Sequence, residues 1–342
     1  MSIHLFKHNQ QAYRAVTAML EKEKMAAVIH PTGTGKSLIA FKLAEENPSK
    51  HFLWLSPSEY IYQTQLEKLN MKFPNIQFMS YSRLMKNEDS IETLHLDYII
   101  LDEFHRCGAQ EWGRSVRKLL DTYPNAKRLG LSATNIRYLD NQRNMAEEIF
   151  DGKIASEMTL GEAIVREILP EPKYVIAMYS YQKELEQLKK RIRTLSNQGL
   201  ITENQKLLEQ LRRALEHADG LELVFKKHMT KKNGKYIVFC SDKEHMDEMK
   251  EQVSTWFRQV DPSPHVYTAF YSDAATGREF TAFKKDDSKH LKLLFCIDML
   301  NEGIHVDDVD GVILLRPTVS PIIYLQQIGR ALSAGSEKTP LI

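Results

Sequence analysis

Two short stretches of the sequence carry residues whose types and spacing suit phosphate chemistry. The first is PTGTGKS, residues 31–37, where two glycines precede a lysine and a serine. Glycines have no Cβ, so backbone N–H groups can close around phosphate oxygens, and the lysine adds a positive charge. The second is Asp102-Glu103, a pair in which one carboxylate can hold Mg²⁺ while the other polarises a water molecule. Together the stretches predict a nucleotide site.

The residues around the first stretch favour a phosphate-binding loop. MAAVIH before it is typical of a short buried strand, and SLIAFKLAEEN after it has apolar residues at helical spacing. The new helix would point its positive dipole end at an anion, Lys36 would reach the terminal phosphates, and Ser37 would hold Mg²⁺. The strict pattern G-x-x-x-x-G-K-[ST] has glycine where this chain has His30. A simple glycine-rich turn is therefore the alternative.

The acidic pair ends a second apolar segment, DYIIL. In an open parallel sheet, ligands bind beyond the carboxyl ends of the strands, which is where both stretches lie. We expect Asp102 to hold Mg²⁺ and Glu103 to orient the water that attacks the terminal phosphate. The alternative is a polar strand end that caps the next helix. LGLSAT, residues 129–134, ends a further strand. A small-hydroxyl turn of this kind is common, so it supports the nucleotide site only because it follows the acids in order.

Alternating helical and strand patterns predict an α/β fold with two parallel sheets. Near-continuous apolar runs such as FLWLS fit strands that are buried on both faces. The expected strands are Ala26–His30, Phe52–Leu55, Ile76–Met79, Tyr98–Leu101, Lys127–Leu131, Tyr236–Cys240, Val266–Ala269, Leu291–Cys296 and Gly311–Leu315. Tyr60–Leu69 and Glu111–Leu120 are typical of amphipathic helices.

Residues 181–229 differ in composition from the rest of the chain and are rich in Lys, Glu, Gln, Leu and Arg. Their leucines recur at helical spacing, and Asn197-Gln198-Gly199 supplies a break, which predicts two antiparallel helices joined by a short turn. A solvated helical hairpin is the plainer interpretation of this insertion. Its basic faces, KKRIR and KKHMTKK, leave a nucleic-acid or partner arm as the alternative.

Composition limits the class of protein. The chain has 342 residues and a formal charge of +1, so a grip on nucleic acid would need a local groove rather than a global cationic field. Three widely spaced cysteines suit a reducing compartment and form no metal-ligand pattern. There is no 18-residue apolar run and no signal segment, so we expect a cytoplasmic protein with no membrane partner.

Taken in order, the motifs resemble those of helicase superfamily 2, the DEAD/DEAH-type nucleic-acid-dependent ATPases. PTGTGKS resembles the family's first motif, whose usual form also lacks the leading glycine. DEFH resembles the second motif and SAT the third. The other similar segments are FKHNQ with Gln10 in the glutamine position, LSPS at 55–58, YIVFCSDKEHM, CIDMLNEGIHV and QQIGRALS. The resemblance covers nearly the whole chain.

This resemblance implies two RecA-like doubly wound domains, residues 1–170 and 171–342, with a helical-hairpin insertion at about 181–229. ATP and Mg²⁺ would bind in the cleft, and single-stranded nucleic acid would cross both domains. Gln10 would read the adenine, and Arg330 would reach across the cleft as an arginine finger. The implied nucleotide-binding residues are Gln10, Thr32, Gly33, Thr34, Gly35, Lys36, Ser37 and Gly303, and the implied coupling residues are His105, Ser132, Thr134 and Gln326.

The sequence departs from the family pattern at two positions. Ser333 stands where a second arginine often follows Arg330, and His305 stands where an acid often follows in CIDMLNEGIHV. The family also adds a strand after the sixth motif, so we expect this chain, which stops soon after it, to be truncated.

The favoured function is an ATP-driven helicase or translocase on DNA. DEFHR and MTLGEAIVREIL resemble the DNA-directed branch of restriction-enzyme subunits and repair helicases. The alternatives are an RNA-directed helicase, an ATP-gated nucleic-acid clamp with weak hydrolysis, motivated by Ser333, and a P-loop kinase or other NTPase. Trp54, Trp112 and Trp256 could stack on bases, but core positions are favoured for all three.

Overall fold

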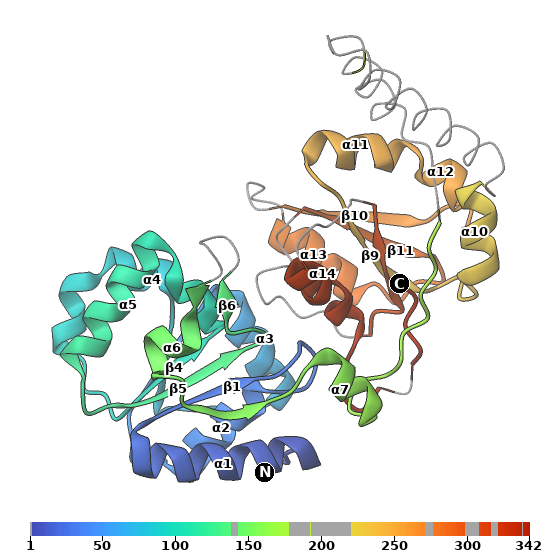
Figure 1. Cartoon of the computed structure of the whole chain (residues 1–342). Helices are drawn as coiled ribbons and strands as arrows, with labels where there is room; N and C mark the ends of the chain where they lie inside the picture. Colours follow the sequence, from blue (N-terminus) through green and yellow to red (C-terminus); the bar gives the residue numbers. More distant parts are fainter. Residues whose placement is uncertain are drawn as a thin grey trace.

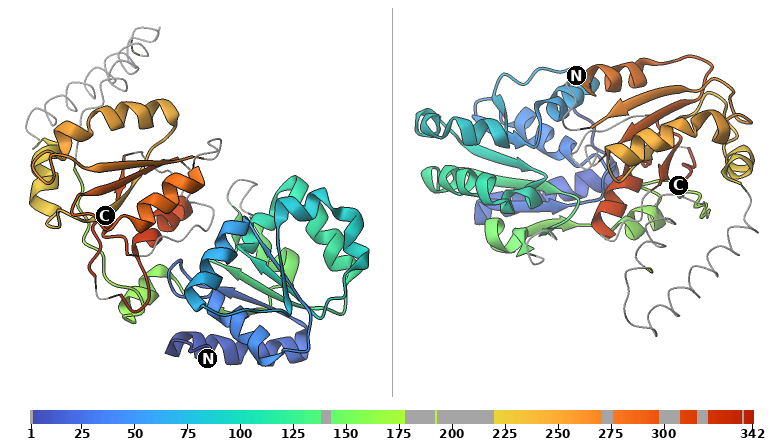
Figure 2. Two further views of the ribbon diagram at one scale, coloured as in Figure 1. Left: turned by 180° about the vertical axis from the view of Figure 1, so that it is seen from behind. Right: turned by 90° about the horizontal axis from the view of Figure 1, so that it is seen from above.

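Two α/β units lie beside each other in the computed structural model (Figure 1). The structure describes residues 2–137, 143–177, 192, 220–270, 276–297, 308–315, 321–336 and 338–342. Each unit is built on its own parallel sheet, and the views in Figure 2 agree that the units meet along one side. The α/β class with two parallel-sheet domains is therefore confirmed.

The first unit alternates short strands with helices. Its elements are α1 (Lys7–Glu23), β1 (Met25–Ile29), α2 (Ser37–Glu46), β2 (Phe52–Ser56), α3 (Glu59–Leu69), β3 (Ile76–Ser80), α4 (Tyr81–Lys86), η1 (Glu88–Thr93), β4 (Tyr98–Asp102), η2 (Phe104–Gly108), α5 (Gln110–Thr122), β5 (Lys127–Ser132), β6 (Ile136–Arg137), β7 (Arg143–Asn144), α6 (Met145–Phe150), β8 (Ile154–Glu157) and α7 (Leu160–Val165).

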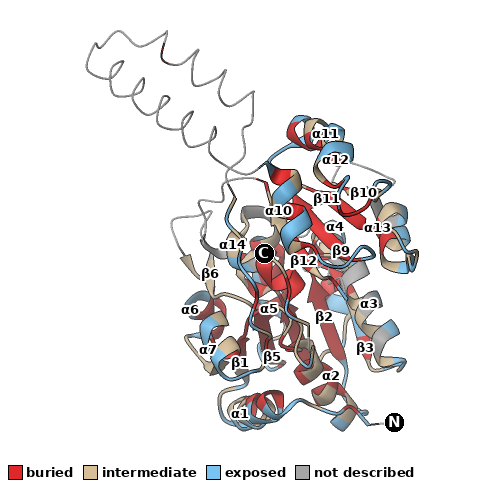
Figure 3. Cartoon of the chain, turned by 90° about the vertical axis from the view of Figure 1, so that its right-hand side faces the viewer, coloured by how far each residue is buried: buried red, intermediate tan, exposed pale blue. Residues whose placement is uncertain are grey.

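Strand order in the first sheet is β3-β2-β4-β5-β1-β8, with every pairing parallel. Alternate residues of each strand face opposite sides of the sheet, so one strand contributes side chains to two hydrophobic cores. Ile99 and Leu101 of β4 join the core under α4, α5 and α6, whereas Ile100 joins the core under α1, α2 and α3. The buried strands are red in Figure 3. Helices thus cover both faces, as a doubly wound sheet requires.

The second unit repeats this plan on a smaller scale. Its elements are α10 (Leu221–His228), β9 (Lys235–Phe239), α11 (Lys243–Glu251), α12 (Val253–Trp256), β10 (His265–Ala269), α13 (Thr276–Lys285), β11 (Lys292–Cys296), β12 (Gly311–Leu314), α14 (Pro321–Ile328) and η4 (Gly329–Ala331). The sheet has the order β10-β11-β9-β12, again parallel. Alternate residues of β9 once more point to two separate cores.

The nine predicted strands are present, each within one residue of its expected bounds. The sequence did not predict β8, whose burial pattern is half-exposed rather than apolar, or the two-residue pair β6–β7. Of the predicted insertion at 181–229, helix α10 is described and packs on the second core through Leu221 and Phe225. Nearly all of the rest of the insertion lies outside the described residues.

The predicted core positions of the tryptophans are confirmed. Trp54 is fully buried between Phe41 and Phe78, with ring centroids 4.6 Å and 5.7 Å away. Trp112 packs against the first core and stacks on Tyr81, and Trp256 packs against the second-domain core. Their rings are therefore used in packing.

Across the part of the chain that the structure describes, we find no helix with both the length and the apolar character needed to cross a membrane.

Candidate nucleotide site at the domain interface

The candidate site lies where three neighbouring strands of the first sheet end. Strand β5 pairs with β4 on one side and with β1 on the other, all in parallel. The phosphate loop follows β1, the acidic pair follows β4, and Ser132 ends β5. Parallel strands bring their carboxyl ends to one edge, so residues up to 100 positions apart in the sequence meet there.

The loop between β1 and α2 has the backbone of a phosphate cradle. Gly33 and Gly35 have φ angles of +89° and +74°, a left-handed region that side chains disfavour. In the described chain, the backbone N–H groups of Gly33, Gly35 and Lys36 donate to no protein acceptor. These groups remain available for an anion at the start of α2, which begins at Ser37.

Two residues of α1 hold this loop from beneath. Asn9 is fully buried, and its Nδ2 donates to the carbonyl oxygens of Thr34 (2.9 Å) and Gly35 (3.1 Å). His8 Nε2 lies 2.8 Å from the same Thr34 oxygen. Thr34 turns its own hydroxyl inward, onto Pro31 O at 2.8 Å. Sequence reasoning missed the roles of His8 and Asn9 because they act across about 25 residues.

His30, at the position of the missing glycine, is buried behind the loop. Its Nε2 lies 2.8 Å from Ser156 Oγ on β8. Burial is the main cause that lowers the pKa of His30 to about 3, and the nearby Lys36 charge lowers it further. The ring is therefore neutral at physiological pH, and it links the loop to a strand that the sequence did not reveal.

Lys36 and Glu103 are close in space. Lys36 Nζ lies 3.8 Å from Glu103 Oε1, and both side chains are about nine-tenths buried. Glu103 has a left-handed backbone with φ +54°, which is unusual for a residue with a side chain and turns its carboxylate toward the loop. Burial alone would raise the pKa of Glu103, but the charges of Lys36, His105 and Arg330 hold it below its usual value.

Asp102 is almost fully buried at the end of β4. Burial is the main cause that raises its pKa, and the neighbouring Glu103 charge adds to the effect. Its backbone carbonyl accepts a hydrogen bond of 2.8 Å from the hydroxyl of Tyr81, a buried residue of α4. A divalent cation would add to the positive charge that Lys36 already places near this buried carboxylate.

The Ser37 hydroxyl accepts a hydrogen bond from Gln65 Nε2 of α3 at 3.0 Å. A hydroxyl oxygen has two lone pairs, so one stays available for a metal ligand role. Ser37 and Asp102 are oxygen donors of the kind that Mg²⁺ prefers. Gln65 is a further residue that no sequence pattern singled out.

A short chain of polar contacts leads from the acids to β5. His105 Nδ1 lies 3.4 Å from Glu103 Oε2 and 2.7 Å from Ser132 Oγ. Ser132 Oγ accepts from the Thr134 backbone N–H at 3.3 Å, and Thr134 Oγ1 accepts from the Ile136 N–H at 3.1 Å. The structure thus brings together three of the four residues expected to couple the sites.

The second domain meets the phosphate loop directly. The Ala334 N–H donates to Gly33 O at 2.9 Å, and a Cβ at position 33 would lie only 2.1 Å from the Leu332 carbonyl oxygen. A Cβ on Gly329 would lie 3.1 Å from Thr32 Cβ. The segment after α14 therefore packs on the loop without room for larger side chains.

Arg330 is 3% exposed in this interface. Burial lowers the pKa of its guanidinium to about 10, while the Glu103 carboxylate opposes that shift. Even so, the guanidinium is charged at neutral pH. A cation from one domain therefore acts electrostatically on Glu103 of the other, with Arg106 as a neighbouring positive charge.

Gln10 lies at one side of the loop, in a recess of about 270 Å³. Its Nε2 donates to Leu5 O at 3.0 Å. The lining residues are Ile3, His4, Leu5, Gln10, Tyr13, Arg14, Lys42 and Glu46. Three expectations fall on undescribed parts of the chain, because Gly303 and His305 lie outside the described residues and the side chain of Gln326 is not described.

Two family models match the chain. One, described as Helicase conserved C-terminal domain, matches residues 213–335. The other, described as Type III restriction enzyme, res subunit, matches residues 2–75 and 64–137. No curated protein matches the chain.

Two solved structures share its fold. The ATP-dependent Type ISP restriction-modification enzyme LlaBIII, solved bound to DNA, is 18% identical with a TM-score of 0.62 over 100% of this chain. A fragment described as an HsdR subunit of a type I restriction enzyme from Vibrio vulnificus YJ016 is 20% identical with a TM-score of 0.64 over 98% of this chain. The chain spans 28% and 63% of the lengths of these two proteins.

The family models follow the same order as the sequence motifs and agree with the two-sheet fold. The N-terminal match covers the phosphate loop and the acidic pair, and the C-terminal match covers Arg330. The resemblance to helicase superfamily 2, on the branch that contains the restriction-enzyme subunits, is thereby confirmed.

Proposed function

We propose that the chain is an ATP-dependent translocase or helicase that acts on DNA, with RecA-like domains at residues 1–170 and 171–342. Hydrogen bonds between Lys173 N and Pro340 O and between Val175 N and Ile342 O support this boundary, because they tie the chain just beyond residue 170 to the second domain. The observation that carries the proposal is that the second domain reaches the site of the first, through the Ala334 hydrogen bond to Gly33 and the electrostatic effect of Arg330 on Glu103.

The residues of the site fit ATP and Mg²⁺. Unpartnered N–H groups on a left-handed glycine loop suit phosphate oxygens, and buried Asp102 suits a cation. Lys36 would hold the terminal phosphates, Ser37 and Asp102 would hold the metal, and the recess at Gln10 would hold the base. Bound Mg²⁺ would neutralise charge that develops on the phosphates.

Glu103 has the position and charge to orient and polarise water. Its depressed pKa keeps it ionised at neutral pH, and Lys36 Nζ and His105 Nδ1 lie 3.8 Å and 3.4 Å from its two oxygens. When nucleotide binds, Lys36 would leave Glu103 and pair with a phosphate instead. One oxygen of the Glu103 carboxylate would then be available to water. Arg330 would stabilise negative charge from the opposite domain.

His105, Ser132 and Thr134 would pass the state of Glu103 to the nucleic-acid side of β5. The two domains would then close and open with the nucleotide state. This motion would shift the chain's contacts along a nucleic-acid strand. Residues 55–58 at the end of β2, LSPS, would contact the nucleic-acid backbone, as their resemblance to the family's strand-end motif implies.

DNA is the proposed substrate rather than RNA, and the cytoplasm the proposed compartment. The restriction-subunit family model and the DNA-bound fold relative support DNA. The alternative is an ATP-gated clamp that grips nucleic acid and hydrolyses slowly. Ser333 motivates it, because serine cannot supply the second arginine of the family pattern.

A triplex-displacement assay tests the proposal. The chain is mixed with duplex DNA carrying a labelled third strand, and release of that strand is followed with ATP, without ATP, and with a Glu103→Gln variant. We expect release by the unaltered chain with ATP only. Hydrolysis of ATP on this DNA without release would contradict translocation, and tight binding with neither would favour the clamp.

A further inference from the structure

A separate cluster of metal-ligating side chains lies at the N-terminal ends of strands in the first sheet, opposite the strand ends that carry the nucleotide site. His51 directly precedes β2, and His95 and Asp97 directly precede β4. The nucleotide-site residues follow strand ends, whereas these residues stand before strand beginnings. One ligand atom from each of the three side chains lies within 4.8 Å of the others.

The local backbone explains why His95 and Asp97 share one side of the chain. Leu94 and Leu96 pack against the first core. In extended backbone, successive side chains point to opposite sides, so His95 and Asp97 face away from that core. His51 lies beside them because β2 pairs with β4, where Phe52 is opposite Tyr98.

Several hydrogen bonds fix the relative position of the three residues. The N–H groups of Asp97 and Tyr98 both donate to His51 O, at 3.0 Å and 3.1 Å. Asp97 O accepts from Lys127 N–H of β5 at 2.8 Å. The ligand-bearing backbone is thus held by three strands.

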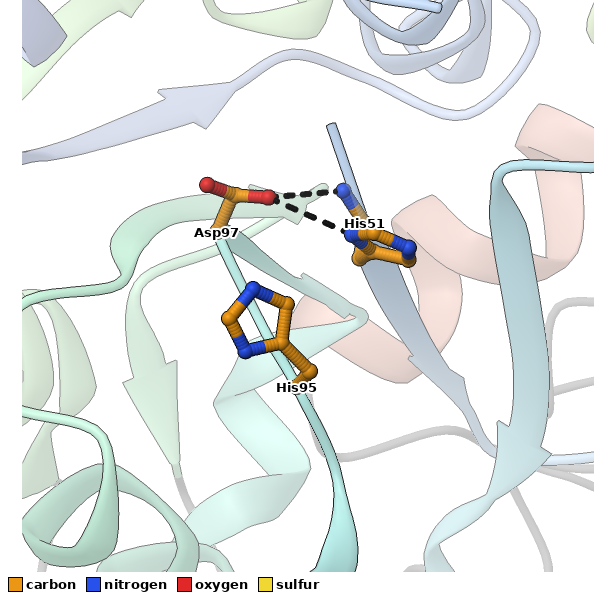
Figure 4. Close-up of side chains that lie close together, drawn as sticks. All are labelled: His51, His95 and Asp97. Atoms are coloured by element: carbon orange, nitrogen blue, oxygen red, sulfur yellow. Dashed lines mark hydrogen bonds and ion pairs between the residues drawn. The ribbon is translucent and has the colours of Figure 1, made fainter. Parts of the chain in front are cut away.

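The side-chain geometry suits a small metal ion (Figure 4). His51 Nδ1 lies 3.6 Å from Asp97 Oδ2. Ligand atoms at about 2.1 Å from a tetrahedral zinc ion are separated by about 3.4 Å, so this pair is already close to that spacing. The ring centroid of His95 is 5.3 Å from that of His51, and His95 makes no hydrogen bond within the described chain.

Two hydrogen bonds from neighbouring residues orient the Asp97 carboxylate. The His51 backbone N–H donates to Asp97 Oδ2 at 2.9 Å, and Lys50 Nζ lies 3.0 Å from the other oxygen, Oδ1. Oriented carboxylates of this kind are typical around bound metals.

We propose that His51, His95 and Asp97 form a binding site for a borderline divalent transition-metal ion of the zinc class. Two imidazoles and one carboxylate favour such ions over Mg²⁺ and Ca²⁺, which prefer oxygen ligands. The exposed histidines leave a fourth position to water. A bound ion would link the N-terminal ends of β2 and β4, and it would stabilise the folded chain because the unfolded chain lacks the site.

Titration of the untagged full chain with zinc, followed by calorimetry in excess Mg²⁺, tests the site. We expect one zinc ion per chain at this cluster and a rise in melting temperature that a chelator reverses. His51→Ala and His95→Ala should each weaken binding by at least about 10–100-fold, the loss typical of altering even an outer-shell partner. Both variants retain the backbone hydrogen bonds that hold the strands.

His290→Ala is the matched control. His290 is half-buried and, like His51, lies beside an aspartate, with Nδ1 3.2 Å from Asp261 Oδ2, but it is in the second domain. This variant should bind zinc as the unaltered chain does. Equal binding by all variants, or a loss confined to His290→Ala, would overturn the proposed site.

Discussion

Lys36 Nζ lies 3.8 Å from Glu103 Oε1, so the cation of the phosphate loop is paired with the carboxylate assigned to water activation. The pair joins two strand ends, and each partner sits in a strained or tightly held stretch of backbone. This arrangement keeps two opposite charges together in a buried site. When a phosphate binds Lys36, Glu103 would lose this partner and keep the nearby positive charges of His105 and Arg330.

The first prediction concerns Glu103. Glu103→Gln removes the group that polarises water but keeps the shape of the side chain, so kcat for ATP hydrolysis should fall about 10²–10⁴-fold. ATP affinity should be retained, because Lys36 and the glycine loop are unchanged. Steady-state hydrolysis and binding of a fluorescent ATP analogue measure the two effects. Glu67→Gln, an exposed position on α3, is the control, and unchanged turnover in Glu103→Gln would remove Glu103 from its role.

The second prediction concerns Arg330. Arg330→Ala should lower kcat about 10³–10⁵-fold if this residue is the arginine finger, with a much smaller effect on ATP binding. Arg258→Ala removes an exposed arginine of the same domain and should leave turnover unchanged. If Arg330→Ala turns over nearly as fast as the unaltered chain, transition-state charge is stabilised by another group.

The third prediction concerns the support of the loop. Asn9→Ala leaves Gly35 O without its buried donor and Thr34 O with His8 Nε2 as its remaining side-chain partner, which costs about 1–3 kcal/mol. We expect ATP affinity to weaken by about 5- to 150-fold. Gln11→Ala, on the exposed side of the same helix, should bind normally. Equal affinities for the two variants would show that α1 does not hold the loop.

The fourth prediction concerns pH and His30. Burial lowers the pKa of His30 to about 3 in the folded chain, against 6.5 as its ordinary value. The unfolded chain therefore binds more protons between these values, and stability falls as pH decreases below 6.5. Relative to a His30→Gln variant, the unaltered chain should lose about 2 kcal/mol of unfolding free energy between pH 7.5 and pH 5. Urea unfolding at the two pH values measures this, and a pH-independent difference would mean that His30 is accessible to protons.

Much of the fold could be predicted because the signals were local. Apolar runs such as those of β2 and β4 fit strands buried on both faces, and the residues of the site follow strand ends directly. Because parallel strands have their carboxyl ends on the same side of the sheet, the sequence predicts that Lys36, Asp102 and Ser132 lie close together. Strand β8 was not predicted because it is an edge strand whose residues are half-exposed, so it has no continuous apolar run.

The supporting contacts of the site could not be predicted, because they join residues far apart in sequence. Asn9, Gln65 and Tyr81 have no motif of their own, and each reaches the site through a hydrogen bond across 21 to 28 residues. The close approach of Leu332 to Gly33 depends on how two domains meet. Such contacts follow from packing rather than from any local pattern.

The most direct test of the central claim is steady-state ATP hydrolysis by the full chain, alone and with single-stranded DNA, duplex DNA and RNA. The account predicts that DNA stimulates hydrolysis and that Glu103→Gln abolishes the stimulated rate. Stimulation by RNA alone would contradict the DNA assignment, and ATP hydrolysis indifferent to every nucleic acid would contradict the proposed function.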